Sequence, residues 1–160
     1  MQIRHSVPGD LAELHRINEA NAPKVGNITA EDLAALIDIS FATLVATRDG
    51  ALAGFVLSLV EKADYDSLNY AWISDKHESF AYVDRVAVDA AFRNQGVGQL
   101  LYEALEREID GQRPVLTCEV NALPPNPGSM RFHERLGFRD IGRRDYDDGA
   151  KAVVYYEKLL

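Results

Sequence analysis

The sequence predicts a single mixed α/β domain, because strand-like runs alternate with segments whose apolar residues recur at helical spacing. The chain has 160 residues, 47% apolar and 26% charged, as is usual for globular proteins. This is the length of one domain, which we place at residues 1–160. In the second half, the order strand–helix–strand–helix predicts at least one parallel pair of strands.

The first half begins with a predicted strand over residues 2–7. Asp10 is expected to cap a helix that begins at Leu11, and Thr29 to cap a second helix, since both residue types accept hydrogen bonds from helical amides. The dipeptide Asp49-Gly50 favours a tight turn between two strands. These strands are predicted at residues 43–47 and 51–60.

Residues 61–79 are polar with embedded aromatic residues, and we expect a loop there. Its aromatic side chains are either core anchors or the wall of a ligand pocket: Tyr65, Tyr70 and Trp72. After this stretch the pattern becomes regular again. Strands are predicted at residues 80–88, 115–120, 138–144 and 151–158, with helices at 96–109 and 129–136. Gly137 suits the end of the last helix.

The formal charge of −8 argues against nucleic acid as the main partner, because phosphate backbones require clustered Lys and Arg. No apolar run approaches the ~20 residues of a membrane helix, so we expect no membrane partner. The single cysteine, Cys118, excludes an internal disulfide and favours a reducing, cytoplasmic location. We interpret it as a small core residue. The four histidines lack metal-ligand spacing, and no metal is expected.

The most specific stretch is the loop that joins the strand at 80–88 to the helix at 96–109. In it Arg93 is followed by Gly96 and Gly98, which open the helix. The first amides of a helix have no internal partner and attract anions, and glycine lets a diphosphate approach the backbone. A Walker loop requires a Lys after its last glycine, and a dinucleotide fingerprint requires a third glycine; both are absent.

A second segment, residues 126–138, follows the next strand. The pattern Arg93-x-x-Gly96-x-Gly98 resembles the acyl-CoA loop of the GNAT (GCN5-related N-acetyltransferase) superfamily. Asn126, Ser129 and the Gly137-Phe138 end resemble the second signature of that superfamily, in the same order and spacing. The resemblance implies a mixed, mostly antiparallel sheet of about seven strands with a splayed parallel pair and about four helices. It also implies acetyl-CoA as co-substrate.

The resemblance assigns the CoA contacts residue by residue. The backbone of one strand would pair with the pantetheine arm, the loop would hold the diphosphate, and the second signature would contact CoA from its other side. These residues are, in order, Val86, Ala87, Val88, Arg93, Asn94, Gln95, Gly96, Val97, Gly98, Gln99, Asn126 and Ser129. A backbone N–H near Val86 or Ala87 would stabilise the oxyanion.

Acyl transfer to an amine also requires a base, and protonation of the leaving sulfur requires an acid. Glu119 is our first choice of base, since ribosomal-protein N-terminal acetyltransferases have a similar Glu-Val pair; otherwise it pairs with Arg85 or faces solvent. Asp84 is the second choice, and strand alternation predicts that Asp84 and Arg85 point to opposite sides. Where the signature usually has the acidic Tyr, this chain has His133, which is either the acid or a packing residue.

The resemblance therefore implies an N-acetyltransferase whose acceptor is a small-molecule amine or a peptide amine, and it allows a homodimer. The alternative is a non-catalytic acyl-CoA-binding module or sensor. The acidic side chains within residues 61–80 are expected to attract a cationic amine. Arg143-Arg144 is interpreted as a solvated strand edge.

Overall fold

The computed structural model describes all 160 residues, which form one seven-stranded sheet in the order β1-β2-β3-β4-β5-β7-β6. The strands are β1 (Gln2–His5), β2 (Ala42–Arg48), β3 (Ala51–Val60), β4 (Ala81–Val88), β5 (Val115–Leu123), β6 (Arg139–Tyr146) and β7 (Lys151–Leu159). The α-helices are α1 (Leu11–Ala20), α2 (Ala30–Ile39), α3 (Leu68–Lys76), α4 (Val97–Ile109) and α5 (Pro127–Arg135). None of the helices combines the length and the apolar character that crossing a membrane requires.

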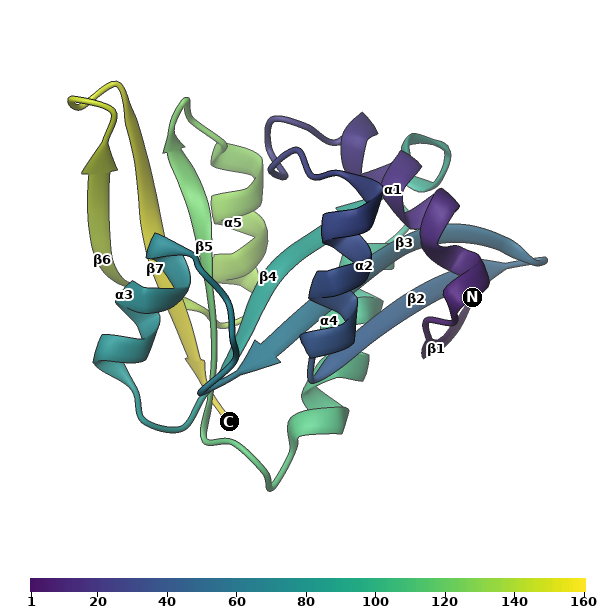
Figure 1. Ribbon diagram of the computed structural model, residues 1–160, viewed down its shortest axis with the longest axis horizontal. Helices are drawn as coiled ribbons and strands as arrows, with labels where there is room; N and C mark the ends of the chain where they lie inside the picture. Colours follow the sequence, from purple (N-terminus) through teal and green to yellow (C-terminus); the bar gives the residue numbers. More distant parts are fainter.

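Helices cover both faces of the sheet and bury one apolar cluster on each (Figure 1). On one face α4 packs across β2, β3 and β4, and α5 packs against β5. On the other face α1 and α2 cover β3 and β4, while α3 lies over the neighbouring part of the sheet. The predicted amphipathic spacing is confirmed for α1, α2 and α4, since each of them buries one apolar stripe.

The predicted parallel pair is β4 and β5, and it is confirmed. Only two residue pairs join these strands, Ala81 with Leu116 and Tyr82 with Thr117, after which the strands diverge (Figure 1). Every other neighbouring pair in the sheet is antiparallel. Beyond Tyr82 of β4 and Thr117 of β5, the facing edges of the two strands have no strand partner. The site described below lies at this opening.

The predicted turn at Asp49-Gly50 is also confirmed. Both residues have positive φ angles, 52° and 81°, as the twist of a two-residue hairpin requires. Thr29 caps α2 as expected, because its side chain accepts a hydrogen bond from the Asp32 amide. The expectation for Asp10 is wrong: its carboxylate makes no cap bond to α1 and instead accepts from the Val7 amide and from Arg4.

The expected loop over residues 61–79 contains a helix, α3. Ser67 begins it by accepting a hydrogen bond from the Tyr70 amide. Tertiary contacts then stabilise it: the Trp72 ring stacks on Tyr155 of β7, with centroids 3.9 Å apart and planes within 6°. Such a short helix is marginal by its own propensity, so packing rather than local sequence determines it.

Candidate active site

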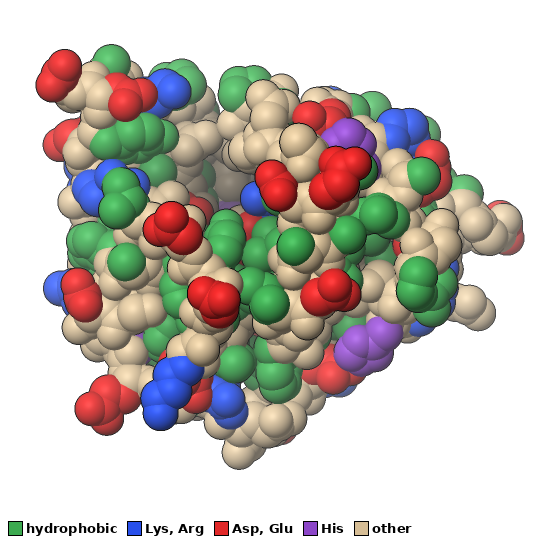
Figure 2. Space-filling view, viewed as in Figure 1, with side chains coloured by type: hydrophobic (Ala, Val, Ile, Leu, Met, Phe, Trp, Pro, Cys, Tyr) green, Lys and Arg blue, Asp and Glu red, His purple; other side chains and the backbone are tan.

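The divergence of β4 and β5 opens a cavity of about 1210 Å³ that runs through the sheet. Its walls come from both sheet halves, from the α1–α2 loop, from the start of α4 and from α5. Figure 2 shows the surface hollowed between the part of the molecule that carries the β6–β7 hairpin and the part that carries α1. One end of the cavity therefore faces the CoA motifs, and the other faces α1–α2 and α3.

Glu119 of β5 points into this cavity from the α3 side of the sheet. The Tyr82 hydroxyl donates to its carboxylate, 2.7 Å from Oε2 and 2.9 Å from Oε1, and the Asn69 amide Nδ2 lies 3.3 Å from Oε1. Burial, assisted by the negative charge of Asp84, raises the pKa of Glu119 to about 8. A carboxylate in this state can take up a proton near neutral pH.

Asp84 and Arg85 lie together on the same side of β4, so the prediction that they point apart is wrong. Val83 pairs with Ser58 and Arg85 pairs with Leu57, which leaves Asp84 as the extra residue of a β-bulge. The bulge shifts the alternation by one residue and turns both side chains toward the cavity. Arg85 Nε then donates to Asp84 Oδ2 at 2.8 Å.

This ion pair is buried, with 4% of the Asp84 side chain and 9% of the Arg85 side chain exposed. The Tyr65 hydroxyl donates to the other Asp84 oxygen at 2.5 Å. Arg85 also donates to Asn18 of α1 and to the carbonyl of Gly26 in the α1–α2 loop. Asp84 is thus occupied by two protein donors, whereas Arg85 connects β4 to the loop that forms one cavity wall.

The predicted CoA loop, residues 93–98, has the geometry of an anion site. Gly96 begins α4 with φ +76°, a left-handed conformation that favours glycine, and a Cβ there would meet no atom within 4 Å. No side chain caps this helix, so its first amides stay open to a ligand. Arg93 and Asn94 line the cavity beside it. Gly98 has a second role, since a Cβ would lie 3.1 Å from the Phe132 ring of α5.

The free edge of β4 suits the pantetheine arm of CoA. Val86, Ala87 and Val88 pair with β3 on one edge only, and all three line the cavity. Unpaired backbone groups on a strand edge recognise extended amide-containing ligands by adding them as a further strand. Together with the uncapped helix start, these residues fit a ligand that carries both amides and a diphosphate.

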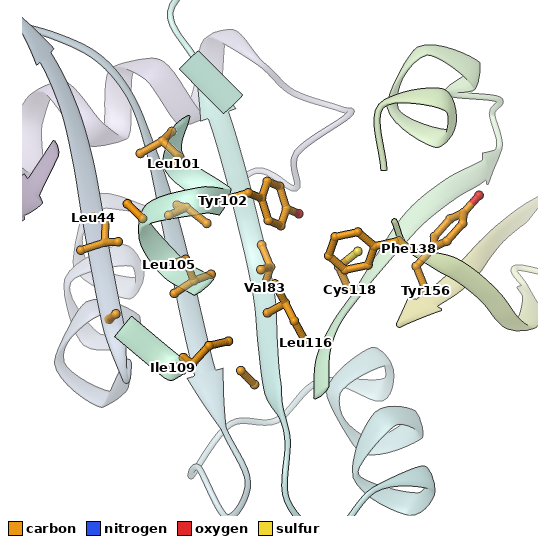
Figure 3. Packing of buried hydrophobic residues seen from close by; sticks show 14 of the residues in the cluster. Leu44, Val83, Leu101, Tyr102, Leu105, Ile109, Leu116, Cys118, Phe138 and Tyr156 are labelled. Atoms are coloured by element: carbon orange, nitrogen blue, oxygen red, sulfur yellow. The ribbon is translucent and has the colours of Figure 1, made fainter. Parts of the chain in front are cut away.

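His133 is buried, with 3% of the residue exposed, and its two ring nitrogens have partners. Nδ1 lies 2.8 Å from the Ser129 carbonyl, so it carries the proton and donates. Nε2 lies 2.7 Å from the Tyr102 hydroxyl, which donates to it. Burial lowers the pKa of His133 and keeps the ring neutral. Figure 3 shows Tyr102 reaching from α4 toward Cys118 and Phe138 on the other half of the sheet.

Tyr65, Tyr70 and Trp72, expected to be either core anchors or pocket wall, differ in position. Tyr65 lines the cavity, whereas Tyr70 is buried and donates to the Val60 carbonyl, and Trp72 packs on β7. The acidic residues within 61–80 do not line the cavity, so the expectation that they attract the amine is not supported. Glu61 instead pairs with Arg113. The carboxyl groups that line the cavity belong to Asp84 and Glu119.

The structure gathers most of the predicted residues around one cavity. All three catalytic candidates line it, and so do the predicted CoA contacts apart from Gln95 and Val97. Val97 is buried in the core, and Gln95 accepts a hydrogen bond from Arg48 on the surface. Cys118 is buried as expected. No group of three or more metal-ligating side chains is present.

Four residues bonded to Glu119, Asp84 or Asn69 were not among the predicted site residues: Tyr82, Arg85, Asn69 and Arg144. Tyr82 carried a usable signal, since it lies two residues before Asp84 on one strand. Arg144, interpreted above as a solvated edge, in fact donates to Asn69 and to Tyr155 and stacks over Tyr146. Its neighbour Arg143 is exposed and pairs with Asp145. No local pattern distinguishes these two arginines.

Comparison with known proteins agrees with this geometry. The sequence model of the "Acetyltransferase (GNAT) family" matches residues 11–138. The chain belongs to the GNAT family of acetyltransferases. This membership accounts for the splayed parallel pair and for the two motifs, and it favours an acetyltransferase over a non-catalytic binding module.

One curated protein and two solved structures are similar to this GNAT chain. N-alpha-acetyltransferase 60 of Xenopus tropicalis is 30% identical over an alignment of 106 residues, which covers 61% of this chain and 43% of that protein. The chain thus spans less than half the length of this relative. The ribosomal-protein-S18-alanine N-acetyltransferase of Escherichia coli aligns with a TM-score of 0.76 at 20% identity, covering 99% and 92% of the two chains. An aminoglycoside 6'-N-acetyltransferase complexed with coenzyme A aligns at 0.75 and 15%, covering 99% and 97%.

Proposed function

We propose that this protein transfers the acetyl group of acetyl-CoA to the α-amine of a polypeptide or of a related small molecule, with Glu119 as general base. The observation that carries this proposal is a carboxylate with a pKa of about 8 in the cavity between β4 and β5, close to the free edge of β4. The names of two relatives, an N-alpha-acetyltransferase and an alanine N-acetyltransferase, support the same acceptor class.

Acyl transfer requires a neutral amine, and an α-amine provides it more readily than a lysine side chain. A free α-ammonium has a reference pKa of roughly 7.7–8.0, against roughly 10.4 for the Lys ammonium. Near pH 8, where Glu119 ionises, about half of the α-amine is therefore neutral. For Lys the same pH lies about 2.4 units below the pKa, so the neutral form costs ~3.3 kcal/mol. This difference supports N-terminal acceptors.

Bound acetyl-CoA supplies the activated acetyl group. The neutral amine nitrogen bonds to the carbonyl carbon, the C–S bond breaks, the amine proton passes to Glu119, and the sulfur leaves as thiolate. A backbone N–H near Val86 or Ala87 on the free edge of β4 would donate to the oxyanion that forms. Asp84 contributes a fixed negative charge near the amine, since Tyr65 and Arg85 already donate to its oxygens.

No side-chain acid is required for the leaving group. The one proton of the neutral His133 ring is donated to the Ser129 carbonyl, and the other nitrogen accepts from Tyr102. Burial also raises the pKa of Tyr102 above its usual range, which makes it a weak acid. A thiol has a reference pKa near 8.5, so the thiolate is an adequate leaving group and solvent protonates it. The lack of a Tyr in the second signature therefore does not favour a non-catalytic sensor.

His133→Phe is expected to retain turnover across neutral pH, with kcat within about threefold of the unmodified protein, because general acid catalysis would contribute ~10²-fold or more. The same change leaves the buried Tyr102 hydroxyl without an acceptor, which costs about 1–3 kcal/mol of unfolding free energy. Steady-state kinetics and urea unfolding measure the two effects. A loss of kcat of ~10²-fold or more, with CoA binding intact, would return His133 to the mechanism.

The pH dependence of kcat is expected to follow the ionisation of Glu119. Because only the carboxylate accepts a proton, kcat should rise with pH through about 8, and at pH 6 it should be ~1% of the plateau. Asp84→Asn should move the midpoint to lower pH, since the negative charge of Asp84 raises the pKa of Glu119. A profile that is flat between pH 6 and 9, or that Asp84→Asn leaves in place, contradicts the assignment.

A further inference from the structure

A chain of three hydrogen-bonded side chains connects the β6–β7 hairpin to Glu119 through α3. Arg144 of β6 donates through Nη2 to Asn69 Oδ1 at 2.9 Å, and the Tyr155 hydroxyl of β7 donates to the same oxygen at 2.8 Å. Arg144 Nε also donates to Tyr155 at 3.0 Å. Asn69 Oδ1 is thus held by two donors, and its Nδ2 points to Glu119 Oε1.

The orientation of the Asn69 amide follows from these contacts. An Asn oxygen accepts two hydrogen bonds and its nitrogen only donates. With the oxygen held by Arg144 and Tyr155, the nitrogen must face the carboxylate, where a donor stabilises the ionised form. Tyr82 donates to the carboxylate from the opposite strand. Between them these two donors orient the Glu119 carboxylate.

Tight packing holds α3 in the position that this chain of bonds requires. The Trp72 ring stacks on Tyr155 one turn after Asn69. On β6, a Cβ at Gly142 would lie 2.6 Å from Trp72 Cζ2, so this strand has no side chain where the indole sits. The hairpin and the helix therefore dock as one unit, and a shift of either moves Asn69.

We propose that Asn69 is a positioning residue for the Glu119 base, and that Arg144 holds Asn69 in place so that the β6–β7 hairpin orients the catalytic carboxylate. The proposal rests on the function proposed above. It assigns Asn69 and Arg144 a role that acts through another residue: neither transfers a proton. Arg143, one residue away on the same strand, faces solvent and provides a matched control.

The charged and titratable groups around Glu119 belong to every element packed against it. They are Tyr82, Asp84 and Arg85 of β4, Tyr65 before α3, Tyr102 of α4, Cys118 of β5, and Tyr155 and Arg144 of the β6–β7 hairpin. Asn69→Ala removes none of these groups and deletes only the amide. Asn69→Asp keeps the shape and replaces the donor by an acceptor, which opposes the ionised form of Glu119.

The test combines titration with kinetics. Carboxyl ¹³C NMR of protein labelled at glutamate, with the Glu119 signal assigned from Glu119→Gln, reports the Glu119 midpoint without any acceptor or CoA. We expect Asn69→Ala to raise this midpoint by about one unit, Asn69→Asp to raise it further, and Arg144→Ala to raise it by less. Arg143→Ala should leave it unchanged. With a peptide that begins in alanine, Asn69→Ala should lower kcat about tenfold at pH 7 while KM for acetyl-CoA stays unchanged.

A Glu119 midpoint that neither Asn69 variant moves overturns the inference, whatever happens to turnover. Equal effects of Arg143→Ala and Arg144→Ala also overturn it. A moved midpoint with unchanged kcat supports the positioning of the carboxylate but counts against the proposed base, so the two failures are distinguishable. Arg144→Ala removes no atom that touches Glu119, and it keeps the test valid where an Asn69 variant does not fold.

Discussion

Glu119→Gln is expected to lower kcat by about 10²–10⁴-fold, the usual contribution of a general base. Gln keeps the size and the hydrogen bond from Tyr82, yet its amide cannot take up the amine proton. Because Glu119 belongs to β5 and not to the loop and helix start that suit a diphosphate, CoA binding should change little. Thiol release from acetyl-CoA with an alanine-initiated peptide gives kcat, and calorimetry gives the Kd of CoA.

Asp84→Asn is the matched control for this loss. It removes a carboxylate from the same cavity, but one whose oxygens already accept hydrogen bonds from Tyr65 and Arg85. Measured above the midpoint of each pH profile, its kcat should remain within about tenfold of the unmodified protein, below the usual contribution of a base. Loss of activity in Asp84→Asn with activity retained in Glu119→Gln would exchange the two assignments.

Arg85→Ala is expected to lower the free energy of unfolding by about 3–5 kcal/mol, because it leaves the buried charge of Asp84 without its partner. It also removes two hydrogen bonds that hold α1 and the α1–α2 loop. Since that loop lines the cavity, KM for the acceptor should rise as well. Urea unfolding followed by circular dichroism measures the loss.

Two further variants test the cause of this destabilisation. Arg143→Ala removes an exposed arginine and should change the unfolding free energy by no more than about 0.5 kcal/mol. Adding Asp84→Asn to Arg85→Ala should recover part of the loss, since a neutral amide replaces the unpaired charge. If Arg85→Ala unfolds like Arg143→Ala, the ion pair does not stabilise the fold.

The elements predicted from sequence are those that local pattern determines. The apolar stripe of α4 and the Asp49-Gly50 turn each depend on a few adjacent residues, and both are confirmed. The helix predicted at residues 129–136 of the second signature is likewise present, as α5. Most of the CoA contacts predicted from the two motifs also line one cavity.

What sequence reasoning missed depends on contacts between distant segments. α3 is stabilised by Trp72 stacking on Tyr155, about eighty residues away in sequence, which no local window contains. The bulge at Asp84 depends on how β3 pairs with β4, and because strand side chains alternate with period two, one extra residue reverses their direction. The pairing of Tyr102 with His133 joins two helices. The bulge changed the interpretation of Asp84, and the pairing with Tyr102 changed that of His133.

The proposed acetyl transfer to an α-amine is tested most directly by the site of acetylation on one peptide that carries both an α-amine and a lysine. A peptide with a free N-terminal alanine and an internal lysine is incubated with the protein and acetyl-CoA, and tandem mass spectrometry locates the acetyl group. We expect acetylation of the α-amine, and loss of this acetylation in Glu119→Gln. Acetylation of the lysine alone, or CoA binding without any acetylated peptide or small-molecule α-amine, would contradict the proposal.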